Sequence, residues 1–227
     1  MIFHYKSQFD KAECIAVMSG LGRPSKNRKT GSIPQVWFLR WDTDPTVAVS
    51  TGLDYSVCGN CKQRWSRGGG CYVVPFMGPR QIWSGAHNSK YQPWHDLEGL
   101  TIRIGAYGDP ASVPANLWNR YILPLQKKNI MLSYTHSWSS ALHLRKSSQA
   151  SIGSERDMRL AHLLGWKTTR IIPDTSSVRN NEILCKAQEQ GKTCEQCMLC
   201  QGKHNICFIS HGTKAERAIS VWDQISY

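Results

Sequence analysis

The chain has 227 residues, of which 41% are hydrophobic, and it carries a formal net charge of +12 at pH 7. This length supports one sizeable core and is too short for two enzyme domains, so we expect a single domain spanning residues 1–227. No stretch approaches the length of a membrane span, and the first residues lack the order of a secretory leader. We therefore expect a cytoplasmic protein that has no membrane partner.

The charge excess comes from 28 Lys and Arg residues against 16 Asp and Glu residues. An excess of this size favours a polyanionic partner, because phosphate contacts release counterions. The densest basic segment has the composition of a loop, and it contains Arg23, Lys26, Arg28 and Lys29. We expect these four cations to contact nucleic acid, with DNA as the first candidate. The alternative is an exposed loop without a partner.

The first predicted strand is Gln35–Arg40, which is rich in β-branched and aromatic side chains. The following segment, 42–99, has few periodic stretches and many Gly, Pro and Trp residues. It is therefore predicted to be irregular. So long an irregular stretch is unusual inside a compact domain unless something holds it, and a bound metal would do so.

From Leu100 onward, predicted strands alternate with predicted helices. The strands are Thr101–Gly105, Ile130–Thr135, Gln149–Ile152, Lys167–Ile172 and Asn205–Ser210. The helices are Val113–Lys128, Ser139–Lys146, one that begins with a capping motif at Ser154 and ends at Gly165, and one at the C-terminus. Strands separated by single helices form a parallel sheet with right-handed crossovers. A closed eight-unit barrel would be cramped at this length. We expect an α/β fold, a partial (β/α) barrel with mostly parallel strands and irregular Cys-rich insertions.

Seven of the nine cysteines fall into two groups. The first group, in segment 42–99, is Cys58, Cys61 and Cys71. The second group, in segment 185–204, is Cys185, Cys194, Cys197 and Cys200. In a reducing compartment, clustered thiols are typical of metal ligands rather than disulfides. Buried structural thiols would account for the remaining Cys14 and Cys207, but not for the repeated C-x2-C spacing.

The two groups favour different roles. The C-x2-C-x2-C run of the second group resembles the run that wraps a [4Fe-4S] cluster, with Cys185 as a fourth ligand. Zinc is the alternative, held by the same cysteines or by three of them with His204 or His211. The first group supplies three thiolates and leaves one metal position open, so we predict that it is the catalytic centre. A fourth ligand could also come from elsewhere in the chain: Cys14, Cys207, His87 or His95.

The segment after the strand that begins at Thr101 is the candidate active-site edge, because parallel sheets place their chemistry at the carboxyl ends of strands. Gly105 and Gly108 allow close approach of the backbone to a ligand, and Asp109 is a candidate acceptor or general base. The alternative is a turn in which Asp109 caps the next helix. His136, at the end of the next strand, is a second candidate base, or a histidine with only structural hydrogen bonds.

Several motifs together resemble a family of small phage-encoded proteins. They are Asn27–Gly31, Ser56–Cys61, Gly70–Val73, Arg103–Pro110, Tyr134–His136, Gly165–Trp166, Thr193–Cys200 and His211–Gly212. The resemblance covers about Asn27 to Gly212. It implies a bacteriophage origin and a shared metal-bound fold.

The chain also resembles, more faintly, the radical S-adenosylmethionine enzymes, which are partial β/α barrels with a [4Fe-4S] cluster on three early cysteines. This likeness implies S-adenosylmethionine as a cofactor, bound at the strand end that contains Gly105, Tyr107, Gly108 and Asp109. It also implies an auxiliary cluster on the later cysteines. The family uses C-x3-C-x2-C, whereas this chain has C-x2-C-x9-C.

Three functions follow from these features. The first, which we favour, is an iron–sulfur enzyme that modifies a nucleotide or DNA. The second is a base-exchanging transglycosylase similar to the deazaguanine-inserting enzymes, with structural zinc, Asp109 as nucleophile or base-recognition residue, and Asp174 as the only other carboxylate at a strand end. The third is a non-catalytic nucleic-acid-binding protein in which both metal sites are structural.

Overall fold

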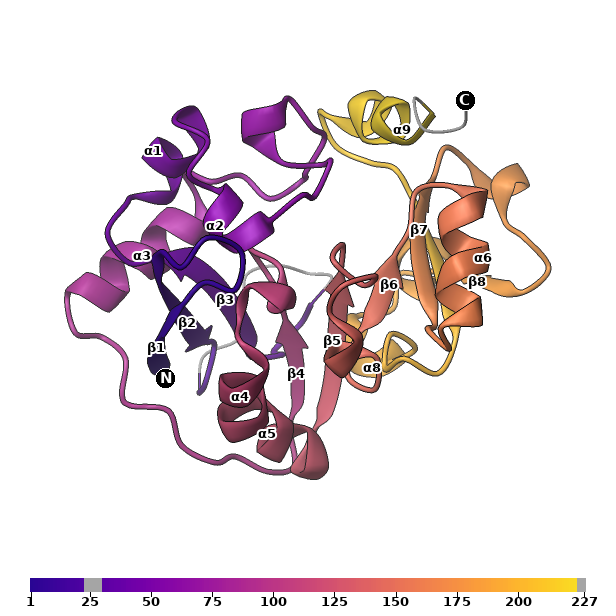
Figure 1. Ribbon diagram of the computed structural model, residues 1–227. Coiled ribbons are helices and arrows are strands. Elements are labelled where there is room, and N and C mark those ends of the chain that lie inside the picture. Colours follow the sequence, from indigo (N-terminus) through magenta and orange to yellow (C-terminus); the bar gives the residue numbers. More distant parts are fainter. Residues whose placement is uncertain (23–29, 224–227) are drawn as a thin grey trace.

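The computed structural model describes residues 1–22 and 30–223 (Figure 1). Within these residues one nine-stranded sheet has the order β1-β2-β3-β4-β5-β6-β7-β9-β8. The strands β1 (Ile2–Lys6), β2 (Glu13–Ser19) and β3 (Gln35–Arg40) pair in antiparallel fashion. Every pairing from β3 onward is parallel. The sheet is open, with β1 and β8 at its two edges.

The parallel part of the sheet agrees with the sequence prediction. Its strands are β4 (Thr101–Ile104), β5 (Ile130–Thr135), β6 (Gln149–Ser151), β7 (Thr168–Ile172), β8 (Glu182–Leu184) and β9 (Asn205–Ile209). The predicted mixed α/β, mostly parallel architecture is confirmed. The N-terminal hairpin and β8 were not predicted.

The prediction that segment 42–99 is irregular was wrong in part, because the segment contains three helices. These are α1 (Pro45–Ser50), α2 (Tyr55–Cys58) and α3 (Gly78–His87), with a 3-10 turn at Trp65–Arg67. The helix α1 begins where the Asp44 side chain accepts a hydrogen bond from Thr46 N at 2.7 Å and a proline occupies the first position.

The helix predicted over Val113–Lys128 is broken into pieces. A 3-10 turn (Pro110–Ser112) leads into α4 (Ala115–Leu117), a π-helical turn (Trp118–Ile122) and α5 (Leu123–Lys128). Pro124 lies in the first turn of α5, and because proline has no N–H to donate to the preceding turn, the regular helical ladder is interrupted there.

The remaining helices are short. The capping motif at Ser154 does begin a helix, α6 (Glu155–Leu163), because the Ser154 hydroxyl accepts from Asp157 N at 3.0 Å. The helix predicted over Ser139–Lys146 is only a 3-10 turn at Leu142–Leu144. The others are α7 (Lys186–Glu189), α8 (Cys194–Cys197) and α9 (Ala215–Asp223). No helix in the described part of the chain is long and apolar enough to cross a membrane.

The side chains of β4 alternate between the two faces of the sheet. Ile102 and Ile104 are fully buried in the same hydrophobic core as Trp118 of the π-helical turn. Thr101 and Arg103 face the opposite side, where the Thr101 hydroxyl lies 3.7 Å from the sulfur of Met198. This second face is the one covered by the segment that contains the later cysteines.

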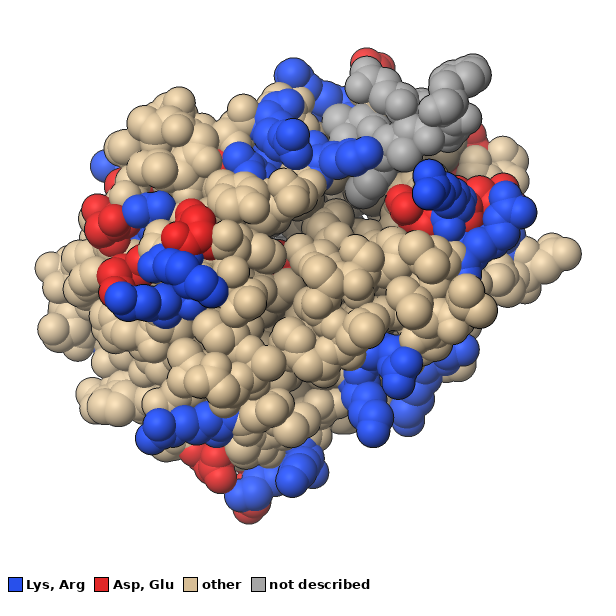
Figure 2. Space-filling view, viewed as in Figure 1, with Lys and Arg blue, Asp and Glu red and all other residues tan. Residues whose placement is uncertain are grey.

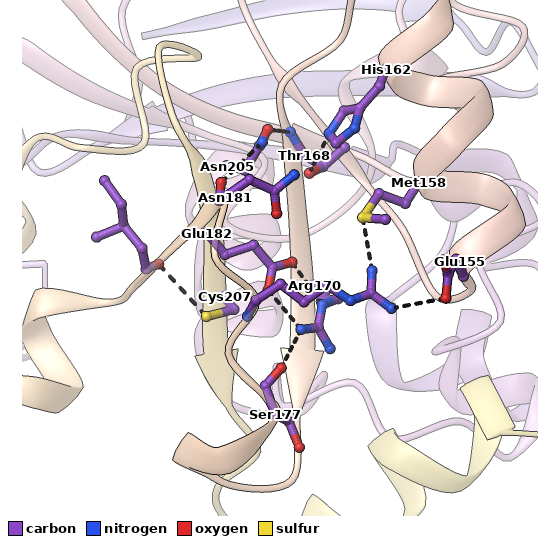
Figure 3. A network of polar contacts seen from close by, with 12 residues as sticks. Glu155, Met158, His162, Thr168, Arg170, Ser177, Asn181, Glu182, Asn205 and Cys207 are labelled. Carbon is purple, nitrogen blue, oxygen red and sulfur yellow. Dashed lines mark hydrogen bonds and ion pairs between the residues drawn. The ribbon is translucent and has the colours of Figure 1, made fainter.

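An ion pair fixes the outer edge of the parallel sheet. Arg170 of β7 lies 2.6 Å from a carboxylate oxygen of Glu182 of β8 and also donates to the Ser177 carbonyl at 2.5 Å (Figure 3). Because β9 lies between β7 and β8, this ion pair connects β7 to β8 across β9. Arg170 therefore has a structural role within the sheet.

Candidate metal centres

The thiols of the first cysteine group share one environment. Burial raises the pKa of the Cys58 thiol well above its usual range, and the neighbouring Cys61 and Cys71 raise it further. Burial likewise raises the pKa values of Cys61 and Cys71. Buried thiols with raised pKa values are poor nucleophiles, whereas metal binding deprotonates a thiol outright. The chemistry of this group therefore suits ligands better than a covalent catalyst.

A buried ion pair holds the loop that contains the first group. The Arg64 guanidinium lies 3.2 Å from Asp54 and donates to the Gly59 carbonyl at 2.7 Å. The Ser66 hydroxyl donates to the same Asp54 carboxylate at 2.5 Å. A buried pair contributes favourably only when such further hydrogen bonds satisfy both charges. This network therefore fixes the shape of the loop by tying Arg64 and Ser66, which lie between Cys61 and Cys71, to Asp54 ahead of the first cysteine.

The C-terminal helix packs against this loop, as Figure 1 shows. The Gln63 side chain donates to the Ala218 carbonyl at 2.8 Å and accepts from Gly70 N at 3.0 Å. A Cβ atom at Gly70 would lie 2.4 Å from the Ala218 nitrogen, so only glycine allows this approach. Helix α9 and the first-group loop therefore form one packed unit, although 155 positions separate Gln63 from Ala218.

Asp109 lies at the carboxyl end of β4, close to this group. One of its carboxylate oxygens accepts from Ala111 N at 2.9 Å and from the Thr135 hydroxyl at 2.7 Å. The other oxygen accepts from His136 N at 2.7 Å. Burial raises the pKa of Asp109 and lowers that of His136, and the Asp109 charge acts to raise the pKa of Cys58. Asp109 caps the turn after β4 and ties it to β5.

The turn before Asp109 is shaped by packing. Gly105 and Gly108 have φ values of 76° and 79°, which favour glycine. A Cβ atom at Gly108 would lie 2.8 Å from Phe38. Tyr107 is buried, and its carbonyl accepts from Phe38 N at 2.9 Å. Contacts within the protein account for both glycines, so their presence does not depend on a ligand.

The substitution Asp109→Asn is expected to destabilise the protein by about 1–3 kcal/mol, because an amide nitrogen would face the His136 N–H and leave this donor unsatisfied. Urea-induced unfolding measures the change. The matched control is Asp174→Asn, since Asp174 is an exposed cap that accepts from Ser176 N at 2.9 Å and asparagine caps equally well. Equal stability of both variants would show that the hydrogen bonds of Asp109 contribute little.

The second cysteine group lines one small cavity with side chains of β5 and β9. Its cysteines are Cys185, Cys194, Cys197 and Cys200. Burial and, to a smaller extent, the charges of the other three cysteines raise the pKa of Cys200 to about 12, although the hydrogen bond from Tyr134 acts to lower it. All four cysteines grouped by their sequence spacing therefore line one cavity on the face of the sheet to which Thr101 and Arg103 point.

Local sequence explains why this group folds as it does. Thr193 and Gln196 form a capping box at the start of α8, with hydrogen bonds of 3.3 Å and 3.0 Å. Met198 adopts a left-handed conformation with φ 51°, which ends the helix after one turn. The Ser32 hydroxyl lies 2.8 Å and 3.0 Å from the two carboxylate oxygens of Glu195, which ties this segment to the chain before β3.

The remaining predicted ligands lie elsewhere. Cys14 and Cys207 are buried in β2 and β9, and the nine cysteines form no disulfide. The His87 ring stacks on Trp41 at a centroid distance of 3.9 Å, and the exposed His95 contacts the Pro93 carbonyl. Across residues 1–22 and 30–223, no three His, Cys, Asp or Glu side chains are placed so that they could hold one metal ion. The predicted nucleic-acid contacts Arg23, Lys26, Arg28 and Lys29 lie outside the described residues.

One residue that the sequence analysis did not single out lies between the two cysteine groups. Arg103 donates a hydrogen bond to the hydroxyl of Tyr72, which directly follows Cys71. Although burial acts to lower it, the pKa of Arg103 is raised by Tyr72, Tyr134 and Cys194. The signal available in the sequence was a charged side chain between two isoleucines of a predicted strand. No protein-family model, curated protein or solved structure matches this chain.

Proposed function

We propose that the chain is an iron–sulfur protein of bacteriophage origin that modifies a nucleotide or DNA in the host cytoplasm. The first cysteine group is its reactive centre, and the second group is its accessory centre. One observation carries this proposal. The three thiols of the first group are partly buried and act on one another, and Asp109 acts on Cys58 and Cys61 from the edge where open parallel sheets place their ligands.

The donor set supports a cluster more than a single ion. Tetrahedral zinc with Zn–S bonds of about 2.3 Å draws its sulfurs to about 3.8 Å from one another. A cubane cluster takes one cysteine per iron, so its sulfurs are further apart. The four thiols of the second group line one cavity, and a C-x2-C-x2-C run with a fourth cysteine is the donor set typical of a cubane cluster. When bound, such a cluster supplies one-electron transfer, and three thiolates leave one of its irons open.

The chain's own residues support the same centres. The positive charge of the Arg103 guanidinium offsets the negative charge of a Cys194 thiolate. The same guanidinium donates a hydrogen bond to the Tyr72 hydroxyl. Asp109 holds the turn in place and connects it to β5. We also propose that the open sheet is a partial (β/α) barrel. Its candidate cofactor is S-adenosylmethionine, bound at residues 105–109.

The transglycosylase alternative is less well supported, because both oxygens of Asp109 already accept hydrogen bonds. A non-catalytic role has one observation in its favour. The first-group loop joins the N-terminal half of the chain to α9 through Gln63 and Ala218, as a structural staple would. In that case both metals only stabilise a nucleic-acid-binding protein.

Metal and sulfide analysis of anaerobically purified protein tests the proposal, together with its visible spectrum before and after dithionite. We expect iron and acid-labile sulfide in equal amounts, with a broad absorbance that the reductant bleaches. Colourless protein with stoichiometric zinc would refute the iron–sulfur proposal and leave the structural staple as the better explanation.

A further inference from the structure

Three cations lie around the first-group loop and the start of α9. The ammonium of Lys214 lies 2.9 Å from the centroid of the Trp65 ring. Arg217 reaches the same loop, since its guanidinium would lie 2.6 Å from a Cβ atom at Gly68. The exposed Arg67 directly precedes that glycine. Together, Arg67, Lys214 and Arg217 form a cationic rim.

The cationic rim has no acidic partner among the described side chains. The ion pairs of residues 1–22 and 30–220 all use other cations. Burial lowers the pKa of Lys214, and the nearby Arg217 lowers it further. Glu216 lies between them in sequence and is exposed, and no ion pair among the described side chains includes it. Even with Glu216 beside them, these three cations leave an excess of positive charge, which is typical of a surface that binds a polyanion.

The rim borders the candidate reactive centre. The charge of Lys214 acts to lower the pKa of Cys71, and the Trp65 indole donates to the Cys71 carbonyl at 2.8 Å. Figure 2 shows Lys and Arg side chains gathered at the upper edge of the molecule, over the region where the purple loop next to α9 lies in Figure 1. A ligand held by this rim would therefore reach the first cysteine group.

Exposed aromatic side chains follow Cys71 in the same segment. Tyr72 is 58% exposed and Phe76 is 56% exposed, whereas most large apolar side chains of the chain are buried. Cations beside exposed aromatic rings are the combination that binds single-stranded nucleic acid, because phosphates pair with the cations and bases stack on the rings. A duplex keeps its bases stacked internally and gains nothing from such rings.

We propose that the cationic rim, with Tyr72 and Phe76, binds a single-stranded nucleic acid and presents one of its bases to the first cysteine group. This inference deepens the proposed function, because it names the substrate class and places it on the molecule. It assigns the contact to residues other than the basic segment 23–29.

Fluorescence anisotropy with a labelled single strand of about 15 nucleotides tests the proposal on the full chain. We expect Arg67→Gln and Arg217→Gln each to weaken binding about three- to tenfold and to reduce the salt slope by about 0.7. Phe76→Ala is expected to weaken binding at least about fivefold through lost stacking. The matched control is Arg156→Gln, an exposed arginine of α6, which should bind like the unaltered protein.

Three outcomes would overturn the proposal: unchanged affinity in both arginine variants, equal affinity for duplex with no effect of Phe76→Ala, or competition by a mononucleotide at the same phosphate concentration. The last would assign the rim to a free nucleotide. Metal content is measured on the same samples. Strand binding by metal-free protein would refute the iron–sulfur proposal alone, whereas metal-loaded protein that binds no strand would refute the rim alone.

Discussion

The substitution Cys200→Ser is expected to remove about four irons per chain and leave the first centre intact. Cys200 lines the same cavity as three other cysteines, so a serine hydroxyl in its place withdraws one of four thiolates from that centre. Cys71→Ser should do the converse, because Cys71 belongs to the separate group with Cys58 and Cys61. Iron and sulfide per chain, measured with the visible spectrum, check both expectations.

The control for both variants is Cys207→Ser. Cys207 is a buried thiol of β9 that lies 3.7 Å from the Ile183 carbonyl, and a serine hydroxyl can keep this contact. It should retain the iron of the unaltered protein. Full iron in Cys200→Ser would contradict a centre on the second group, and equal losses in all three variants would indicate general unfolding.

Sequence patterns predicted much of the fold, and cysteine spacing predicted which four cysteines line one cavity. The strands β3 and β5 were predicted with their observed bounds, because each is a short apolar run rich in branched or aromatic residues. Cys185 was assigned to the second group although eight residues separate it from Cys194, and both line one cavity. Short-range patterns therefore located these strands and grouped these cysteines correctly, because each pattern lies within a few residues.

A strand without alternating buried and exposed residues, and contacts between residues far apart in the sequence, were not predicted. In β2 five consecutive residues, 14–18, are buried, so the strand has no alternation that distinguishes it from a buried helix. The helix α1 did have a readable start in Asp44 and its following proline. The contact of Gln63 with Ala218 joins opposite ends of the chain, and no local pattern encodes it.

Asp109 shows why site residues are harder to predict than strands. The sequence allowed a general base or a cap, and both need an acidic residue at a strand end. One carboxylate oxygen of Asp109 accepts from the Thr135 hydroxyl and the other accepts from His136 N, and both donors lie at the end of another strand. Its role therefore depends on how β4 and β5 align, which single-sequence patterns do not specify.

The substitution Arg64→Met is expected to destabilise the protein by about 3–5 kcal/mol, because it leaves the Asp54 carboxylate buried without its cation. The two side chains are 8% and 2% exposed, so solvent cannot replace the lost partner. The substitution also removes the donor to the Gly59 carbonyl, next to Cys58. Urea unfolding measures the loss, and the iron content of the first centre should fall with it.

Two further variants separate the buried charge from the loss of a long side chain. Arg159→Met removes an arginine whose 3.8 Å pair with Glu155 is 75% and 60% exposed, so it should cost no more than about 0.5 kcal/mol. The double variant Asp54→Asn with Arg64→Met should cost less than the sum of its single substitutions, since it leaves no isolated charge. Additive losses would show that the two side chains act independently. The shape of the first-group loop would then have to come from its packing against α9 rather than from this ion pair.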